Sequence, residues 1–237
     1  MTVAGQGPAA RSEGNRPSRL DDTLHGLSDR RAIVLTGGDP VEAGLADELP
    51  AAAYVIAADS GIEQAARLGL VVDLAVGDFD SVAPAALEAA ESSGCQVERH
   101  PGAKDHTDLE LGLLAARAWG ADAVTVVGGY GGRLDHFLAN ALVLASEDLA
   151  TMTIEARMGG ARLLVVRDRA RWQGRPGDLV TLLALGGRAR GVRTEGLRYP
   201  LEGDDLYPGS TRGVSNEMAA QVATVALATG VLLVVRP

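Results

Sequence analysis

The first half of the chain alternates short apolar runs with segments of helical periodicity. We expect strands at residues 32–35, 52–57, 74–77, 96–99 and 123–127, and helices at 41–49, 62–68, 84–93, 108–119 and 134–146. Thr107 and Glu110 have the spacing of a capping box, which predicts that a helix begins there. Strands that alternate with helices predict the α/β class, with a mostly parallel sheet that is covered on both faces.

The pattern changes after about residue 150. Short apolar or β-branched runs follow at 152–156, 162–166, 178–185, 188–193, 221–227 and 231–235, separated by Gly-Gly, Pro-Gly and Asp-Asp signals and without helical periodicity. This pattern predicts an antiparallel β domain, either a sandwich or a barrel. We therefore expect a flexible tail at residues 1–28, an α/β nucleotide-binding domain at 29–150 and a β domain at 151–237.

Composition narrows the possible partners. A formal net charge of −9 and an aromatic content of 3% argue against binding to nucleic acid, although not against binding to nucleotides. The chain has no apolar run long enough to span a bilayer and no signal-peptide pattern at its start, so we expect a cytoplasmic protein. The single cysteine, Cys95, excludes an intramolecular disulfide and a multi-cysteine zinc site.

Two carboxylates, Asp78 and Asp80, follow the apolar run at residues 74–77. Alternate side chains of an extended backbone point the same way, so we expect these two to lie side by side at the end of a strand. Paired carboxylates repel each other unless a cation relieves the repulsion, and Mg²⁺ prefers such oxygen ligands. A solvated, Asp-rich turn is the alternative interpretation.

Further clusters follow other predicted strands. They are Asp59-Ser60-Gly61, the stretch from Lys104 to Asp108, and the glycine-rich stretch from Gly128 to His136. Because the carboxyl ends of parallel strands share one edge, we expect the clusters to converge there. Lys104 is the only lysine of the chain, which places a compact cation beside Asp105 and Asp108.

The glycine-rich stretch has neither the dinucleotide fingerprint nor a Walker A loop, yet its glycines and the following helix N-terminus suit a phosphate. Alternatives stay open here. Arg133 either binds a phosphate through its guanidinium or forms an exposed ion pair. His136 either donates a hydrogen bond to a phosphate or is a capping or core histidine. Capping of the helix alone would account for Asp108.

These motifs, in this order and spacing, resemble the thiamine pyrophosphokinase family. The resemblance rests on Asp-x-Gly at 59–61, Gly-Asp-Phe-Asp-Ser at 77–81, Lys-Asp-x-Thr-Asp at 104–108 and Gly-Gly-x-Gly-Gly-Arg-x-Asp-His at 128–136. It continues through residues 191–201 and 210–217 and covers about residues 32–235. The resemblance implies an N-terminal α/β domain followed by a C-terminal β-sandwich, in a homodimer whose active sites lie between the two subunits.

The resemblance also implies the reaction and the site. The pyrophosphoryl group of ATP would pass to the hydroxyethyl oxygen of thiamine, with Mg²⁺ present. Asp78, Asp80, Asp105 and Asp108 would hold Mg²⁺ and the phosphates, and Lys104 and Arg133 would neutralise phosphate charge. Asp59, Gly128, Gly129, Gly131, Gly132, Asp135 and His136 would complete the nucleotide site, while Ser215 and Asn216 would hold thiamine. Without the family, Ser215-Asn216 is typical of a turn.

One departure and two rival functions complete the expectations. Many family members have glycine where this chain has Ser60, so we expect a strained residue there if that position requires a positive φ. A pyrophosphokinase for a pterin alcohol is the nearest rival, and the segment 210–217 favours thiamine over it. The other rival is a non-catalytic nucleotide-binding regulator, which the many carboxylates argue against.

Overall fold

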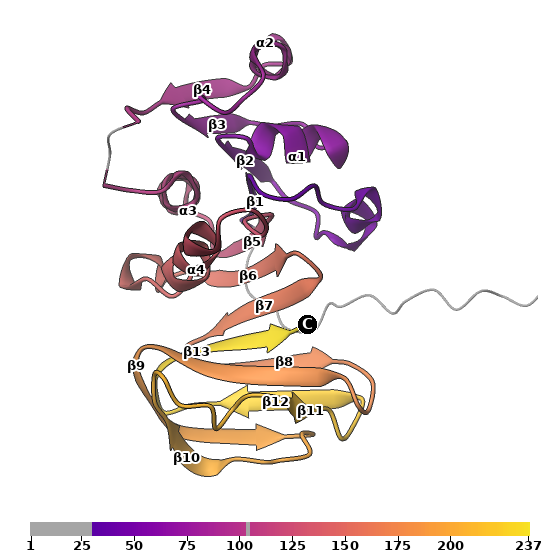
Figure 1. Cartoon of the computed structure of the whole chain (residues 1–237), viewed down its shortest axis with the longest axis vertical. Helices are drawn as coiled ribbons and strands as arrows, with labels where there is room; N and C mark the ends of the chain where they lie inside the picture. The colour runs from indigo at the N-terminus through magenta and orange to yellow at the C-terminus, as the bar shows by residue number, and fades with distance from the viewer. Residues whose placement is uncertain (1–29, 103–104) are drawn as a thin grey trace, which may run out of the picture.

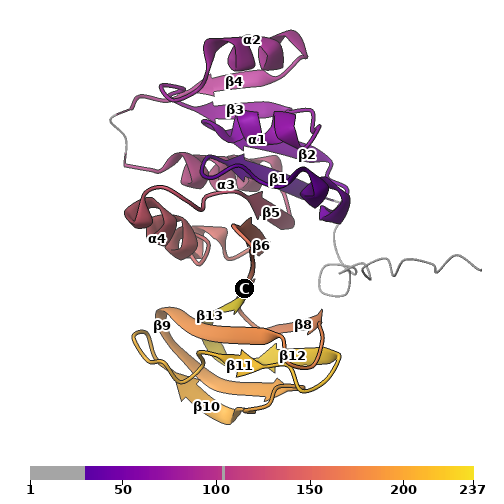
Figure 2. The same cartoon turned by 45° about the vertical axis from the view of Figure 1, so that its right-hand side comes forward.

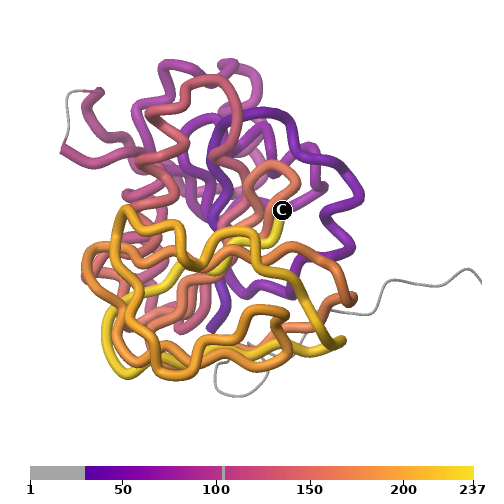
Figure 3. Tube along the Cα trace, turned by 60° about the horizontal axis from the view of Figure 1, so that its bottom comes forward, coloured from indigo at the N-terminus to yellow at the C-terminus, as the bar shows by residue number. Residues whose placement is uncertain are grey.

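The structure, a computed structural model, describes residues 30–102 and 105–237. Its strands follow one hydrogen-bonded path in the order β4-β3-β2-β1-β5-β6-β7-β13-β9-β12-β8, and β10 and β11 pair with β9 off this path. Figures 1 and 2 show the helix-containing part at one end of the long axis and strands β8–β12 at the other. In Figure 3, the C-terminal strands lie in front of the α/β part.

The first part is a parallel sheet whose strands alternate with helices. Its strands are β1 (Arg31–Thr36), β2 (Tyr54–Ala58), β3 (Leu74–Gly77), β4 (Gln96–Arg99), β5 (Ala123–Val127) and β6 (Thr153–Met158). The connections contain η1 (Ala43–Glu48), α1 (Gly61–Arg67), α2 (Pro84–Ser92), α3 (Asp108–Trp119), α4 (Leu134–Val143) and η2 (Glu147–Leu149). All pairs among these six strands are parallel, as the alternating pattern predicted.

Both faces of the central strands β1, β2, β3 and β5 are buried, which explains why these strands are almost entirely apolar. In β1, Ala32 and Val34 belong to a core with α3, whereas Ile33 and Leu35 belong to a second core with α1 and α2. Each core buries the inward stripe of its helices against alternate strand positions. Packing on both faces holds these parallel strands in register, so the carboxyl ends of β1, β2, β3 and β5 lie along one edge of the sheet.

The second part is antiparallel and continues the same sheet. Its strands are β7 (Ala161–Val166), β8 (Arg169–Gln173), β9 (Leu179–Glu195), β10 (Glu202–Leu206), β11 (Asn216–Glu217), β12 (Val222–Ala226) and β13 (Thr229–Arg236). β9 pairs with β13 over its first half and with β10 and β12 over its second half. A third core, which includes Trp172, Leu182 and Val225, fills the space that these strands enclose.

Four expectations about elements need correction. The run at 152–156 was expected in the antiparallel part, but β6 pairs parallel with β5 because α4 and η2 carry the chain back across the sheet. The runs at 178–185 and 188–193 form one strand, β9. Gly186 has φ +67°, and the β9–β13 register shifts next to it, so the Gly-Gly signal marks a bulge within the strand.

The other two corrections concern a strand that was not expected and a helix of a different type. The Asp-Asp signal at 204–205 was interpreted as a break between strands, but it lies inside β10. The helix expected at 41–49 is the 3₁₀ segment η1, whose apolar residues are only partly buried against the core under α1 and α2. Among the described residues, no helix is both long and apolar enough to cross a membrane.

Candidate functional site

Three aspartates meet at the carboxyl ends of β2 and β3. Asp59 directly follows β2, and Asp78 and Asp80 follow β3. One carboxylate oxygen from each lies within 4.8 Å of the others. The parallel strand pattern predicted this convergence, although the pairing of Asp78 and Asp80 was expected from an extended backbone.

The backbone between these two aspartates is a tight turn instead. Phe79 has φ +60° and is buried, and the Asp80 amide donates to Asp78 Oδ1 at 3.3 Å. Burial of the Phe79 ring in the core under α1 and α2 holds the turn in this conformation. The two carboxylates are therefore brought together by a turn around a buried aromatic ring. The alternation of side chains along an extended strand, which the sequence suggested, is not the cause.

Asp59 occupies a constrained position beside that turn. It has φ +48°, and its amide donates to Val76 O at 2.8 Å. Gly77 has φ +149°, and a Cβ atom there would lie 3.2 Å from the Asp59 backbone, so glycine is favoured at this position. Ser60 has φ −63°, so the strain that was expected at Ser60 is absent. The residue with the positive φ is Asp59 instead.

The cluster has the properties of a cation site. Asp59 Oδ1 is buried and has no hydrogen-bond partner among the described residues, while Ser81 Oγ donates to Asp59 Oδ2. The negative charge of Asp78 is the main cause that raises the pKa of Asp80, followed by desolvation and by the charge of Asp59. A bound Mg²⁺ would relieve this repulsion and give the orphaned oxygen a partner, so these residues fit Mg²⁺. The metal was expected at Asp78 and Asp80 together with Asp105 and Asp108, whereas Asp59 was expected at the nucleotide.

Of the acidic residues at the start of α3 and in the loop before it, only some lie near the three aspartates. Thr107 caps α3, because the Glu110 amide donates to Thr107 Oγ1 at 3.2 Å. Asp108, half-buried at the first position of α3, contributes to the raised pKa of Asp80, so it lies close to the cluster. Asp105 is exposed in the preceding loop, and Lys104 lies outside the described residues.

The glycine-rich loop lies beside the loop that follows β1. The Gly129 amide donates to Gly37 O, and the Asp39 amide donates to Tyr130 O, both at 2.7 Å. A Cβ atom on Gly128 would lie 2.2 Å from Thr36 O, so only glycine fits there. The loop after β1 was not among the predicted site residues, although its Gly37-Gly38-Asp39 sequence after a buried strand was a signal.

A buried glutamine holds the loop after β1 in place. The side chain of Gln64, on α1, is 5% exposed. Its Oε1 accepts from the Val41 amide at 3.1 Å, and its Nε2 donates to Asp39 O at 3.2 Å. Sequence reasoning missed this residue, because a glutamine on a helix face is ordinarily solvated.

Arg133 and Asp135 form a two-point ion pair at the start of α4. Arg133 Nη2 lies 2.5 Å from Asp135 Oδ2, and Arg133 Nε lies 3.2 Å from Asp135 Oδ1. The hydrogen bond from Arg133 is the main cause that lowers the pKa of Asp135 to about 2. Both side chains are exposed, as is His136, so this guanidinium fork faces solvent next to the glycine-rich loop.

Ser215 and Asn216 lie in the antiparallel part. Ser215 is exposed with φ +56°, whereas Asn216, which begins β11, is buried. Asn216 lines a cavity of about 270 Å³ whose other walls are residues 199–201 and 211–214. Figures 1 and 2 place β11 in the half of the molecule opposite β2 and β3, so one chain does not bring this cavity to the aspartates.

Comparisons with known proteins agree on one family. The family description "Thiamin pyrophosphokinase, catalytic domain" matches residues 45–155, and "Thiamin pyrophosphokinase, vitamin B1 binding domain" matches residues 168–232. A curated relative, the thiamine pyrophosphokinase of Bacillus subtilis (strain 168), is 26% identical over 191 residues, which cover 76% of this chain and 86% of the relative.

Solved structures of the same family share the fold. The structure of thiamine pyrophosphokinase from Bacillus subtilis has a TM-score of 0.76 and 23% identity, over 87% of this chain and 98% of the other. That of thiamin pyrophosphokinase from Candida albicans has a TM-score of 0.71 and 14% identity, over 87% and 89% of the two chains. At these identities the structural likeness concerns the fold alone.

Proposed function

We propose that this chain, which belongs to the thiamine pyrophosphokinase family, transfers the pyrophosphoryl group of ATP to the hydroxyl oxygen of thiamine. The products are thiamine pyrophosphate and AMP. The observation that carries this proposal is the convergence of Asp59, Asp78 and Asp80 within the stretch that matches the catalytic description. A separate cavity lies within the stretch that matches the vitamin B1 binding description.

The acidic cluster is the proposed metal site. Asp59, Asp78 and Asp80 would hold Mg²⁺, with Asp108 close by. When bound, Mg²⁺ neutralises charge on the polyphosphate and aligns the reacting groups. The predicted roles of Asp105 and Lys104 at the phosphates stay predictions.

The proposed chemistry is an in-line displacement at the β-phosphorus of ATP. The thiamine hydroxyl oxygen forms a bond to this phosphorus and gives up its proton to a base, for which Asp80, Asp105 and Asp108 are the candidates. The bond from the phosphorus to the bridging α–β oxygen breaks, and AMP leaves. Such transfers depend on positioning and charge neutralisation more than on covalent participation by the protein. The chain therefore needs to hold the polyphosphate rigidly, which suits the interlocked loops after β1 and β5.

The glycine-rich loop and the start of α4 are the proposed phosphate-binding side of the nucleotide site. Backbone amides of a glycine-rich loop and of a helix N-terminus attract anions. Arg133, whose guanidinium is paired with Asp135, would exchange that carboxylate for a phosphate of ATP. Asp135 and His136 would then complete the nucleotide contacts, as the sequence predicted.

We also propose that the active unit is a homodimer in the cytoplasm, and that the domain boundary, expected near residue 150, follows β6 at residue 158. β2 and β9 are six strand steps apart in the sheet, or about 30 Å at roughly 4.8 Å per step. A second chain could bring its cavity to the aspartates of the first. The helix α4 supports association, because Leu134, Leu138 and Leu142 lie along one exposed stripe and α4 buries none of its residues.

The decisive experiment measures AMP release from ATP and Mg²⁺ with and without thiamine, and detects thiamine pyrophosphate by mass spectrometry. We expect thiamine-dependent AMP together with that product. The isosteric variant D80N should lose about 100-fold or more in turnover, the scale of losing one electrostatic stabiliser of a transition state. A matched control is D168N, because Asp168 is exposed in the turn between β7 and β8.

Each alternative result has a defined meaning. Near-normal turnover by D80N at saturating Mg²⁺ would show that the metal assignment is wrong. AMP release with a pterin alcohol but not with thiamine would identify the other pyrophosphokinase. Binding of ATP without AMP release, for any acceptor, would identify a nucleotide-binding regulator.

A further inference from the structure

The side chain of Asn216 is already engaged by the backbone of a neighbouring loop. Its Oδ1 accepts from the Tyr199 amide at 3.0 Å and from the Glu217 amide at 2.9 Å. Its Nδ2 donates to Tyr199 O at 2.7 Å. The two amide donors on one atom and the carbonyl on the other fix the orientation of the Asn216 amide group.

These contacts use most of the hydrogen-bonding capacity of Asn216. Both lone pairs of Oδ1 and one of the two Nδ2 hydrogens have partners. The side chain is 6% exposed, so its amide group is held within the protein. A side chain in this state cannot accept a hydrogen bond from a ligand without releasing a backbone amide into a buried position, which is costly.

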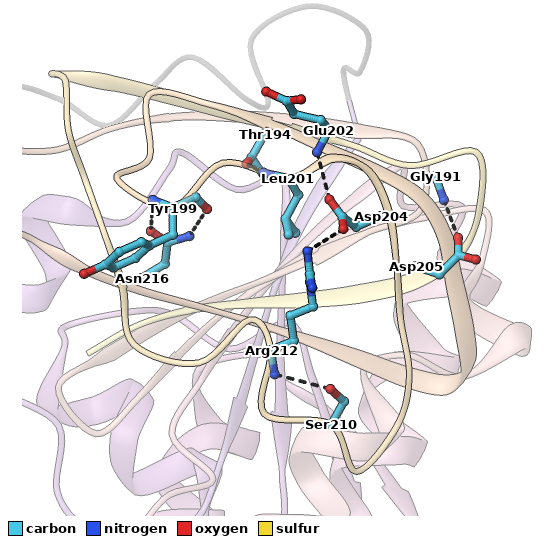
Figure 4. A network of polar contacts seen from close by, with 10 residues as sticks. All are labelled: Gly191, Thr194, Tyr199, Leu201, Glu202, Asp204, Asp205, Ser210, Arg212 and Asn216. Carbon is cyan, nitrogen blue, oxygen red and sulfur yellow. Dashed lines mark hydrogen bonds and ion pairs between the residues drawn. The ribbon is translucent and has the colours of Figure 1, made fainter.

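The same loop is held at its other end by Thr194. Thr194 Oγ1 accepts from the Leu201 amide at 2.9 Å, and the Thr194 amide donates to Leu201 O at 2.9 Å. Thr194 is 6% exposed and lies near the end of β9. Pro200, between the two clamped residues, has no N–H to satisfy. Figure 4 shows Asn216 beside Tyr199 and Thr194 beside Leu201.

The clamped segment forms one wall of the cavity of about 270 Å³. The opposite wall, residues 211–214, is held separately: Arg212 Nη2 lies 2.5 Å from Asp204 Oδ1, and the Arg212 amide donates to Ser210 Oγ at 3.3 Å. The width of the cavity therefore depends on how firmly residues 199–201 are held. Preorganised walls bind a ligand more tightly, because less order is lost on binding.

We propose that Asn216 and Thr194 are positioning residues that hold residues 199–201 as the fixed wall of the acceptor cavity. This assigns Asn216 a role different from the direct thiamine contact that the family resemblance implied. The proposal rests on the proposed function for the identity of the acceptor. The clamp itself is a property of the unliganded protein.

The test combines hydrogen–deuterium exchange of the unliganded full chain with steady-state kinetics. In N216A, the peptide that contains Tyr199 should exchange at least about tenfold faster than in the unsubstituted protein. T194V, which keeps the shape of the side chain but removes the acceptor, should accelerate exchange at Leu201. N216D should give an intermediate rate at Tyr199, because it retains the accepting oxygen but loses the donor.

The kinetic readout separates positioning from general damage. We expect the KM for thiamine to rise about tenfold in N216A and in T194V, the factor expected for one lost hydrogen bond. The KM for ATP should stay within about twofold, since the nucleotide site lies in the other half of the chain. S215A is the matched control for exchange: it alters the same turn but leaves the clamp intact, so exchange at Tyr199 should not change.

Two results would overturn the proposal. The first is a raised KM for thiamine in N216A with unchanged exchange at Tyr199, which would make Asn216 a direct ligand. The second is faster exchange in both clamp variants with an unchanged KM for thiamine, which would show that the wall does not shape the acceptor site. Absence of turnover with thiamine in the unsubstituted protein would instead contradict the proposed function, while the exchange data would still report on the clamp.

Discussion

Ser81 is the residue that orients Asp59 in the acidic cluster. Its hydroxyl donates to Asp59 Oδ2, whereas the buried Oδ1 has no hydrogen-bond partner in the part of the chain that the structure describes. Groups that hydrogen-bond to metal ligands commonly contribute 10- to 100-fold to metal affinity. We expect S81A to weaken the binding of Mn²⁺, used as a probe for Mg²⁺, by about tenfold in titrations followed by electron paramagnetic resonance.

The control for this prediction is S93A. Ser93 also donates one hydrogen bond through its hydroxyl, to Ala90 O at 2.7 Å, but it lies at the end of α2. Mn²⁺ affinity should not change in S93A. Unaltered Mn²⁺ affinity in S81A would show that Asp59 does not depend on Ser81 for its orientation. Because the readout is metal binding, it does not require turnover.

Residue chemistry could be predicted from the sequence where it depends on neighbours along the chain. The cap formed by Thr107 and the convergence of Asp59, Asp78 and Asp80 follow from local spacing and from parallel topology. The engagement of Asn216 by Tyr199 could not be predicted, because it joins residues 17 positions apart through a loop of irregular backbone.

At the scale of elements, the loop after β5 distinguishes two reasons for a glycine. Gly128 has φ +97°, and a Cβ atom there would lie 2.2 Å from the Thr36 carbonyl oxygen, whereas Gly132 has φ +65° and open space around it. We expect G128A to lower the free energy of unfolding by about 3 kcal/mol or more, because strain and a backbone clash add. G132A, which meets only the strain of a positive φ, should cost about 1 kcal/mol.

Urea unfolding of both variants, followed by circular dichroism, measures this difference. If both variants lost the same free energy of unfolding, the loops after β1 and β5 would be able to move apart and accommodate the added Cβ atom at little cost. From the sequence, these glycines were expected to allow the close approach of a phosphate, with an ordinary strand-to-helix turn as the alternative. The packing of Gly128 on β1 depends on strand order, which the hydrophobic pattern did not specify.

Most element types in the parallel part were predictable, since its central strands are almost entirely apolar and each is followed by glycine or aspartate. The edge strands of the second part were not. β10, with the sequence Glu-Gly-Asp-Asp-Leu, buries only Leu206, so its strand conformation comes from pairing with β9. Local propensity opposes that pairing, and tertiary contacts prevail.

At the scale of the whole molecule, the separation of the aspartates from the acceptor cavity makes a test by complementation possible. In the proposed homodimer, each active site takes its aspartates from one chain and its cavity from the other. Assayed at a thiamine concentration well below the raised KM, a chain with D80N and a chain with the double change S215A and N216A should each lose about tenfold or more of the activity of the unsubstituted protein. A heterodimer of the two has one site with both defects and one site with neither.

Co-expression of the two differently tagged chains, followed by sequential affinity purification, isolates that heterodimer. We expect it to recover about half of the activity of the unsubstituted dimer, because one of its two sites is intact. Sedimentation should give twice the 24.4 kDa mass of the chain for every sample. L138E should lower that mass if the exposed leucine stripe of α4 lies in the contact. An inactive heterodimer of full dimer mass would place both halves of each site in one chain, and the sheet would then have to bend enough to bring β11 to β2.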